Sequence, residues 1–150
     1  MSKTVFTSHS DQETIEFARK FAKSVKPGSV LAMEGDLGAG KTTFIKGLAL
    51  GLGLKRKDEV KSPTFVIMHV YEASVPIYHF DLYRLDDEKD FQAIGLDEFA
   101  HDPHSICCIE WADKAKAWLP DATHRVSLRH GGPTTRMIEI TPLKKTGSKE

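Results

Sequence analysis

The sequence predicts a single α/β domain in which helices flank a mixed β-sheet, and three observations support this fold class. The chain has 150 residues, which is the length of one ordinary domain with one core. Segments with the apolar patterns of strands alternate with segments whose apolar residues recur at helical spacing. A glycine-rich stretch at residues 33–44, MEGDLGAGKTTF, joins an apolar strand directly to a helix. We assign residues 1–141 to the domain and expect residues 142–150 to form a disordered tail.

The first half of the chain predicts a strand, a helix, a second strand and a second helix. Residues 3–8 form the first strand, and Ser10 to Glu13 have the pattern of a capping box that begins the first helix. Residues 29–34, SVLAME, are a short apolar run typical of a buried strand. The helix that follows the glycine-rich stretch is expected to end at Gly53.

The second half predicts two hairpins around a buried strand. Residues 62–73 and 75–85 are strand candidates joined by a short polar link. Residues 105–111, SICCIEW, form the unbroken apolar run of a central strand. Residues 124–130 and 135–141 flank a Gly-Gly-Pro turn as a second hairpin. Two less regular segments predict a short helix or turn at residues 86–95 and a helical piece at residues 113–119.

Composition excludes several classes of protein. Lysine plus arginine and aspartate plus glutamate number 21 each, so no global basic field would hold a nucleic acid, and any contact with RNA would be local or through a partner. No apolar run approaches the ~20 residues that span a bilayer, and residues 1–12 lack a signal-peptide pattern, so we expect a cytoplasmic protein without membrane contact. Cys107 and Cys108 are neighbours that point to opposite faces of a strand, which favours core packing over a disulfide.

The glycine-rich stretch contains the pattern of a phosphate-binding loop, Gly35-x4-Gly40-Lys41-Thr42. In such loops glycines let successive backbone N–H groups point inward, the lysine reaches the β and γ phosphates, and the hydroxyl ligates Mg²⁺. The start of the helix adds the positive end of its dipole. The candidate ATP-binding residues here are Asp36, Leu37, Gly38, Ala39, Gly40, Lys41, Thr42 and Thr43. The alternative is a glycine-rich turn with a solvated lysine.

A magnesium site beside this loop needs an acid at the end of a neighbouring strand. Glu110 ends the unbroken apolar run and is our candidate ligand, because open α/β sheets bind ligands at the carboxyl ends of their central strands. Asp81 ends a more alternating strand and is our candidate for orienting water or supporting the first acid. For both carboxylates, the alternative is an ordinary charge at a strand end.

Two further residues have open assignments. Thr64 has the hydroxyl of a segment that closes on a γ-phosphate, but a Ser-Pro turn that begins a strand explains the same residues. Trp111 could stack on a base or pack as an ordinary tryptophan.

His69 and His79 are expected to face each other across the first hairpin, without a convincing third metal ligand.

Motifs in four places resemble the TsaE family, also called YjeE, which is required for making threonylcarbamoyladenosine in tRNA. They are GDLGAGKTTF at residues 35–44, KSPTF at 61–65 followed by Tyr71, YHFDLYRL at 78–85 and IEWAD at 109–113. The resemblance implies a P-loop NTPase-like fold and a Mg-ATP-dependent subunit that acts with TsaB and TsaD, the latter carrying out the carbamoyl transfer. Contact with tRNA would then be indirect. The resemblance also implies residue roles: Thr42 and Glu110 bind magnesium, Lys41, Asp81 and Thr64 support hydrolysis, and Trp111 and Asp11 lie near the nucleotide and its adenine.

Other functions share the same loop. A small-molecule kinase would transfer the phosphoryl group to a bound acceptor, but the chain has little length for an acceptor domain. A GTPase would need an Asn-Lys-x-Asp motif, which the sequence lacks. A nucleotide sensor that binds without turnover differs from an ATPase mainly in whether Asp81 functions.

Overall fold

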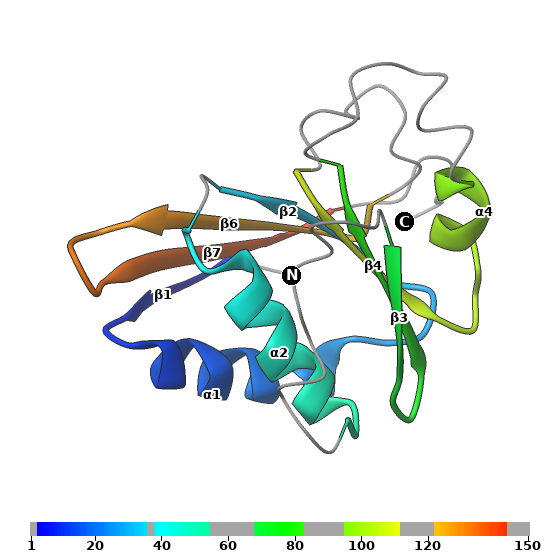
Figure 1. Cartoon of the computed structure of the whole chain (residues 1–150), viewed down its shortest axis with the longest axis horizontal. Helices are drawn as coiled ribbons and strands as arrows, with labels where there is room; N and C mark the ends of the chain where they lie inside the picture. Colours follow the sequence, from blue (N-terminus) through cyan, green and yellow to red (C-terminus); the bar gives the residue numbers. More distant parts are fainter. Residues whose placement is uncertain (1–2, 36–37, 55–67, 83–94, 112–121, 144–150) are drawn as a thin grey trace.

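A mixed β-sheet with helices on both faces forms the described part of the protein in a computed structural model (Figure 1). The structure describes residues 3–35, 38–54, 68–82, 95–111 and 122–143. The strands are β1 (Thr4–Ser8), β2 (Val30–Glu34), β3 (Met68–Glu72), β4 (Pro76–Asp81), β5 (Ile106–Glu110), β6 (His124–His130) and β7 (Arg136–Pro142). They are arranged in the order β1-β7-β6-β2-β5-β4-β3. The predicted α/β class with a mixed sheet is confirmed.

Parallel strands occupy the centre of the sheet, and antiparallel hairpins form its margins. Strand β2 is parallel to β5 on one side and to β6 on the other, and β5 is also parallel to β4. The hairpin partners β3 and β4 are antiparallel, as are β6 and β7, while β1 pairs with β7 at the far edge. Because β2, β5 and β4 run in the same direction, their carboxyl ends meet at one edge of the sheet, next to the start of α2.

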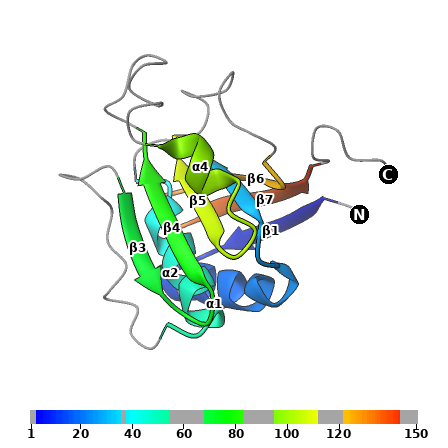
Figure 2. The ribbon, with the colours of Figure 1, turned by 90° about the vertical axis from the view of Figure 1, so that its right-hand side faces the viewer.

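Two long helices cover one face of the sheet and a short one lies against the other (Figure 2). Helix α1 (Asp11–Phe21) continues into a short 3₁₀ helix, η1 (Ala22–Ser24), and packs beside α2 (Lys41–Gly51). Its predicted cap is present, because the Ser10 hydroxyl accepts a hydrogen bond from the N–H of Glu13 at 3.1 Å. Helix α4 (Leu96–Ala100) contributes to the apolar cluster on the opposite face.

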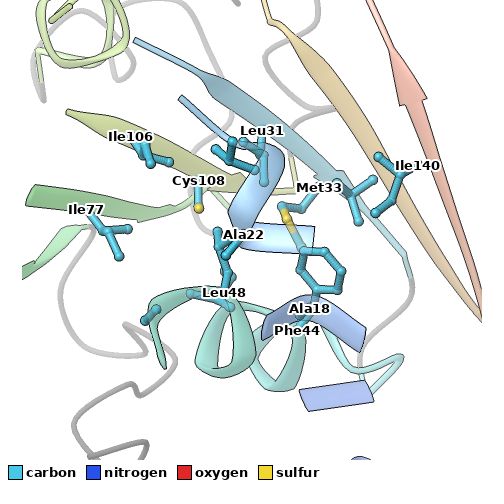
Figure 3. Packing of buried hydrophobic residues seen from close by; sticks show 14 of the residues in the cluster. Ala18, Ala22, Leu31, Met33, Phe44, Leu48, Ile77, Ile106, Cys108 and Ile140 are labelled. Atoms are coloured by element: carbon cyan, nitrogen blue, oxygen red, sulfur yellow. The ribbon is translucent and has the colours of Figure 1, made fainter. Parts of the chain in front are cut away.

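The larger core lies between the sheet and helices α1 and α2 (Figure 3). Phe44 and Leu48 of α2 meet Leu31, Met33 and Ile77 of the strands there, all of them fully buried. This packing fixes α2 along the face of the central strands.

The two cysteines face opposite sides of β5, as predicted. Cys108 belongs to the core under α2, whereas Cys107 belongs to the cluster under α4, and both are free thiols. Burial, together with the nearby charge of Glu110, raises the pKa of Cys108 to about 12. Burial also raises the pKa of Cys107 well above its usual value, so both thiols stay protonated near neutral pH.

Helices α1 and α2 approach each other closely because two glycines of α2 face α1. A Cβ atom on Gly47 would lie 2.3 Å from the carbonyl oxygen of Ile15, and one on Gly51 would lie 2.5 Å from that of Arg19. The facing positions on the first helical segment are also small, at Ala18 and Ala22. The absence of side chains at the two glycines therefore sets the distance between the helices.

Some sequence predictions fall outside the described residues or differ from the structure. The predicted segments at 62–67, 86–94 and 113–119, and most of the predicted tail at 144–150, lie outside the described residues. Strand β7 reaches Pro142, the first residue assigned to that tail, and the domain boundary stays a prediction. Helix α4 was not predicted, because five residues after Gly95 are too few to establish a helical period. Within the described part, no helix is long and apolar enough to cross a membrane.

The close approach of the two helices predicts that Gly47→Ala destabilises the protein. In an open helix this change would add about 1 kcal/mol of stability, because alanine has the higher helix propensity. Here the new methyl group would meet backbone, and we expect a net loss of about 1–3 kcal/mol in the free energy of unfolding, measured in urea. Lys46→Ala, on the same helix, is the control and should change stability by less than about 0.5 kcal/mol. A Gly47→Ala variant as stable as the parent protein would contradict this account.

Candidate functional site

The loop between β2 and α2 depends on glycines for its backbone conformation. Gly38 has a φ of 78° and Gly40 a φ of 101°, in the left-handed region that favours glycine. Gly35 has a φ of 151°, and a Cβ atom there would lie 2.5 Å from the carbonyl oxygen of Leu128 in β6. The first glycine thus lets the loop pack against a neighbouring strand, and the last one turns the chain into α2.

Lys41, the first residue of α2, is held inside the loop. Its Nζ donates a hydrogen bond to the carbonyl oxygen of Gly35 at 2.5 Å and lies 4.1 Å from the centroid of the Trp111 ring. The residue is 5% exposed, so the carbonyl dipole and the ring face offset part of the cost of burying its charge. The Lys41 side chain therefore folds back over the loop in which it is predicted to bind phosphate.

Trp111 directly follows β5 and has an unusual backbone conformation. Its φ is 60°, and among the described residues no other non-glycine residue has a positive φ. Such a conformation costs about 1–2 kcal/mol in a residue with a side chain and is found preferentially at functional sites. The turn directs the ring towards Lys41. Trp111 thus contacts both Lys41 and the second apolar cluster, and its place beside a nucleotide stays a prediction.

Glu110 reaches the start of α2 from the carboxyl end of β5. Its strand lies between β2 and β4 and is parallel to both, which confirms the predicted central position. The Thr42 hydroxyl donates a hydrogen bond to Glu110 Oε2 at 3.1 Å. The glutamate is only 3% exposed. The structure therefore brings together two of the residues that the sequence singled out for magnesium.

A histidine and a tyrosine that the sequence analysis did not assign to the site lie behind Glu110. His79 Nε2 is 2.5 Å from Glu110 Oε2, and His79 Nδ1 is 2.8 Å from the Tyr71 hydroxyl. The predicted pairing of His69 with His79 is correct in register, but His79 turns towards the glutamate. A signal was available in the sequence, because His79 precedes Asp81 by two residues and must share its face of the strand.

Asp81 lies beside Glu110 at the same edge of the sheet. The two residues are register partners in the parallel pair of β4 and β5, so their side chains start from the same face. Asp81 is partly exposed, whereas Glu110 is buried. Glu110 is thus the more enclosed of the two acids, and it contacts the first turn of α2.

The oxygen atoms at this edge suit a magnesium ion. Mg²⁺ prefers oxygen ligands at about 2.1 Å in an octahedral arrangement, which separates adjacent ligands by about 3.0 Å. Thr42 Oγ1 and Glu110 Oε2 are 3.1 Å apart. No group of three or more His, Cys, Asp or Glu side chains suited to a metal occurs among the described residues. A magnesium ion here would therefore take further ligands from phosphates and water, as is usual for this ion.

The structure describes some of the remaining predicted site residues but not others. Ala39 is buried and Thr43 is partly buried next to the loop, while Asp11 is exposed at the first position of α1. Asp36, Leu37 and Thr64 lie outside the described residues. Their roles, and that of Asp11 near an adenine, stay predictions.

Comparison with known proteins finds relatives that match over most of the chain. The family described as "Threonylcarbamoyl adenosine biosynthesis protein TsaE" matches residues 8–138. A tRNA threonylcarbamoyladenosine biosynthesis protein TsaE from Bacillus subtilis is 44% identical over 133 residues, covering 88% of this chain and 81% of its own length. Its counterpart from Treponema pallidum is 41% identical over 133 residues, with 89% and 96% covered.

A solved structure extends the match to the fold. The crystal structure of Bacillus subtilis YdiB superposes with a TM-score of 0.77 at 34% identity, covering 96% of this chain and 88% of that one. The predicted P-loop NTPase-like fold is confirmed by this match together with the loop, sheet and helix described above. Sequence and fold agree over most of the chain, and the protein therefore belongs to the TsaE family.

Proposed function

We propose that this protein is a Mg²⁺-dependent ATPase that takes part in making threonylcarbamoyladenosine in tRNA, as a nucleotide-driven subunit of a protein complex. The observation that carries the proposal is the contact between Thr42, at the start of α2, and Glu110, at the end of the central strand β5. A glycine loop that ends in lysine and a hydroxyl, joined to a strand-end acid, is the arrangement of phosphate-binding sites. The biosynthetic role is carried over from the relatives named above.

Lys41 is the residue that would bind the β and γ phosphates. In the structure its ammonium group contacts a loop carbonyl and the ring of Trp111, which are weaker partners for a cation than a phosphate. Binding of ATP would exchange these partners for phosphate oxygens. Because the lysine already lies within the loop, the exchange requires a movement of the side chain rather than of α2.

Thr42 and Glu110 would hold the magnesium ion, either directly or through a water, and the ion would neutralise charge on the phosphates. Asp81 would orient the attacking water, because it lies beside Glu110 and is the more exposed of the two acids. Thr64, which lies outside the described residues, is proposed to assist on the γ-phosphate side. Separate environments for two neighbouring acids favour separate roles.

We further propose that the complex contains TsaB- and TsaD-type proteins and that the isolated subunit hydrolyses ATP slowly. The net charge of zero gives little basis for independent binding of tRNA, so contact with tRNA would pass through these partners. The β3–β4 hairpin is a suitable element for communication, because Tyr71 and His79 connect it to Glu110. A partner that senses the hairpin would therefore sense the nucleotide site.

Lys41→Met should weaken nucleotide binding by about one to two powers of ten. The change retains the aliphatic stem beside Trp111 and removes a charge-assisted contact that is generally worth about 1.5–3 kcal/mol. Calorimetric titration with ADP and with a non-hydrolysable ATP analogue measures the effect. Lys46→Met is the matched control on the same helix and should bind as the parent protein does. Equal affinities for all three proteins would rule out the phosphate-binding loop.

The two acids should separate by role when each is converted to its amide. Glu110→Gln retains an oxygen that can accept from His79 but lowers the charge, so it should reduce the magnesium dependence of nucleotide binding. Asp81→Asn should bind Mg-ATP normally and release phosphate at least tenfold more slowly, since positioned acid–base groups contribute about 10²–10⁴ in rate. Thin-layer analysis of labelled ATP measures turnover. The reverse pattern would exchange the roles, and a labelled product other than phosphate would indicate a kinase. Binding without any turnover, even with partners, would indicate a sensor.

Nucleotide state should control binding of the TsaB–TsaD partner. A switch requires different partner affinity in its two states, so the ATP form should bind at least fivefold more tightly than the ADP form, and the partner should accelerate hydrolysis. Affinities with the ATP analogue, with ADP and without nucleotide, at one salt concentration, provide the measurement. Thr64→Ala should reduce the difference while sparing ATP binding. Equal affinity in all three states would leave a constitutive scaffold.

A further inference from the structure

A chain of polar side chains crosses the core beneath the site and ends at Glu110. It starts at Tyr71 in β3, passes through His79 in β4 and Glu110 in β5, and ends at Thr42 in α2, with successive distances of 2.8, 2.5 and 3.1 Å. Tyr71 is 6% exposed and His79 is fully buried. Residues far apart in the sequence thus form one hydrogen-bonded row inside the molecule.

The surroundings of this row are apolar on the side of the main core, and His69 lies on its outer side. Tyr71 belongs to the main hydrophobic core, and His79 is the register partner of the buried Cys108 on one side and of His69 on the other. An apolar pair at positions 71 and 79 would pack in such a core without the cost of removing a hydroxyl and an imidazole from water. Packing alone therefore does not explain why these two polar residues lie there.

The direction of the hydrogen bonds follows from the chemistry of Glu110. A carboxylate has no hydrogen to donate, so His79 Nε2–H is the donor to Oε2. In the neutral ring, Nδ1 is then an acceptor, and the Tyr71 hydroxyl donates to it. Tyr71 thereby selects the tautomer that keeps a hydrogen on Nε2, and it also fixes the plane of the ring.

The same carboxylate oxygen accepts from the Thr42 hydroxyl and from His79. Two donors from different directions restrict the rotation of the glutamate side chain, which is otherwise costly in entropy to fix. Outer hydrogen-bond partners of this kind orient the ligands of metal sites and raise metal affinity.

We propose that His79 and Tyr71 are positioning residues that aim Glu110 at Thr42, so that the two oxygens form a preorganised magnesium-binding pair. The inference rests on the proposed function, because it assumes that the pair serves Mg-nucleotide. His79 sets the direction of the carboxylate, and Tyr71 sets the orientation of His79. In this role the two residues act through Glu110 and not by contact with the nucleotide.

Matched variants distinguish positioning from packing. Tyr71→Phe removes only the hydroxyl that orients His79. His79→Asn is too short to reach Glu110, whereas His79→Gln can place an amide N–H where Nε2 now lies. Tyr78→Phe removes a tyrosine hydroxyl from the opposite face of β4, where the ring packs against Phe99, and serves as the control.

The measurement is the affinity of Mn²⁺ for the ADP complex by electron paramagnetic resonance, with ADP affinity in EDTA measured by calorimetry. We expect His79→Asn to weaken Mn²⁺ binding about 10–100-fold and Tyr71→Phe several-fold, with ADP affinity in EDTA unchanged. His79→Gln should recover much of the loss, and Tyr78→Phe should match the parent protein. Thermal melts confirm that each variant is folded.

Other results overturn the inference in distinguishable ways. If folded Tyr71→Phe and His79→Asn bind Mn²⁺ as the parent does, the two residues do not position the ligand. If ADP affinity falls equally with metal and in EDTA, or if only the melting temperature falls, the row is structural. If the parent complex itself binds no Mn²⁺, the proposed magnesium site fails, and this inference fails with it.

Discussion

One buried oxygen, Oε2 of Glu110, joins the elements that build the site. It accepts hydrogen bonds from Thr42 at the start of α2 and from His79 in β4, while Glu110 itself ends β5. Burying a carboxylate without partners would cost several kcal/mol of folding free energy. Removing either donor would therefore destabilise the protein by part of that amount. The loop before α2 therefore has a fixed end point. Its shape depends on this anchor as much as on its own glycines.

Helix α2 is fixed along its side as well as at its end. Gly47 and Gly51 allow it to lie against the backbone of α1, and Phe44 and Leu48 bury its other side on the sheet. A helix held by close backbone contact cannot slide without losing both the packing and the bond at its first turn. Under the proposed function, any movement on nucleotide binding would therefore fall to side chains such as Lys41 rather than to α2.

Local patterns predicted most of the described fold and singled out Thr42 and Glu110, which the structure places in contact, because the relevant signals are short in sequence. The glycine spacing before Lys41 and the unbroken apolar run ending in Glu110 each require a particular backbone environment. Tyr71 and His79 were not assigned to the site, because their role depends on which strands become neighbours. Helix α4 was missed because so short an element is stabilised by its packing rather than by a period in its sequence.

The hydrogen-bonded row also gives the edge of the sheet a physical connection to the proposed nucleotide site. Strand β3 is the outermost strand beside β4 in the described sheet, and its Tyr71 reaches Glu110 through a single histidine. A protein bound at this edge could influence the carboxylate only if it altered the register or tilt of the hairpin, since a uniform contact would shift no equilibrium. Conversely, a change in the ligands or hydrogen bonds of Glu110 would alter the position of Tyr71 in β3 through the same bonds. The proposed role as a nucleotide-driven subunit would require this reciprocity of the element that contacts a partner.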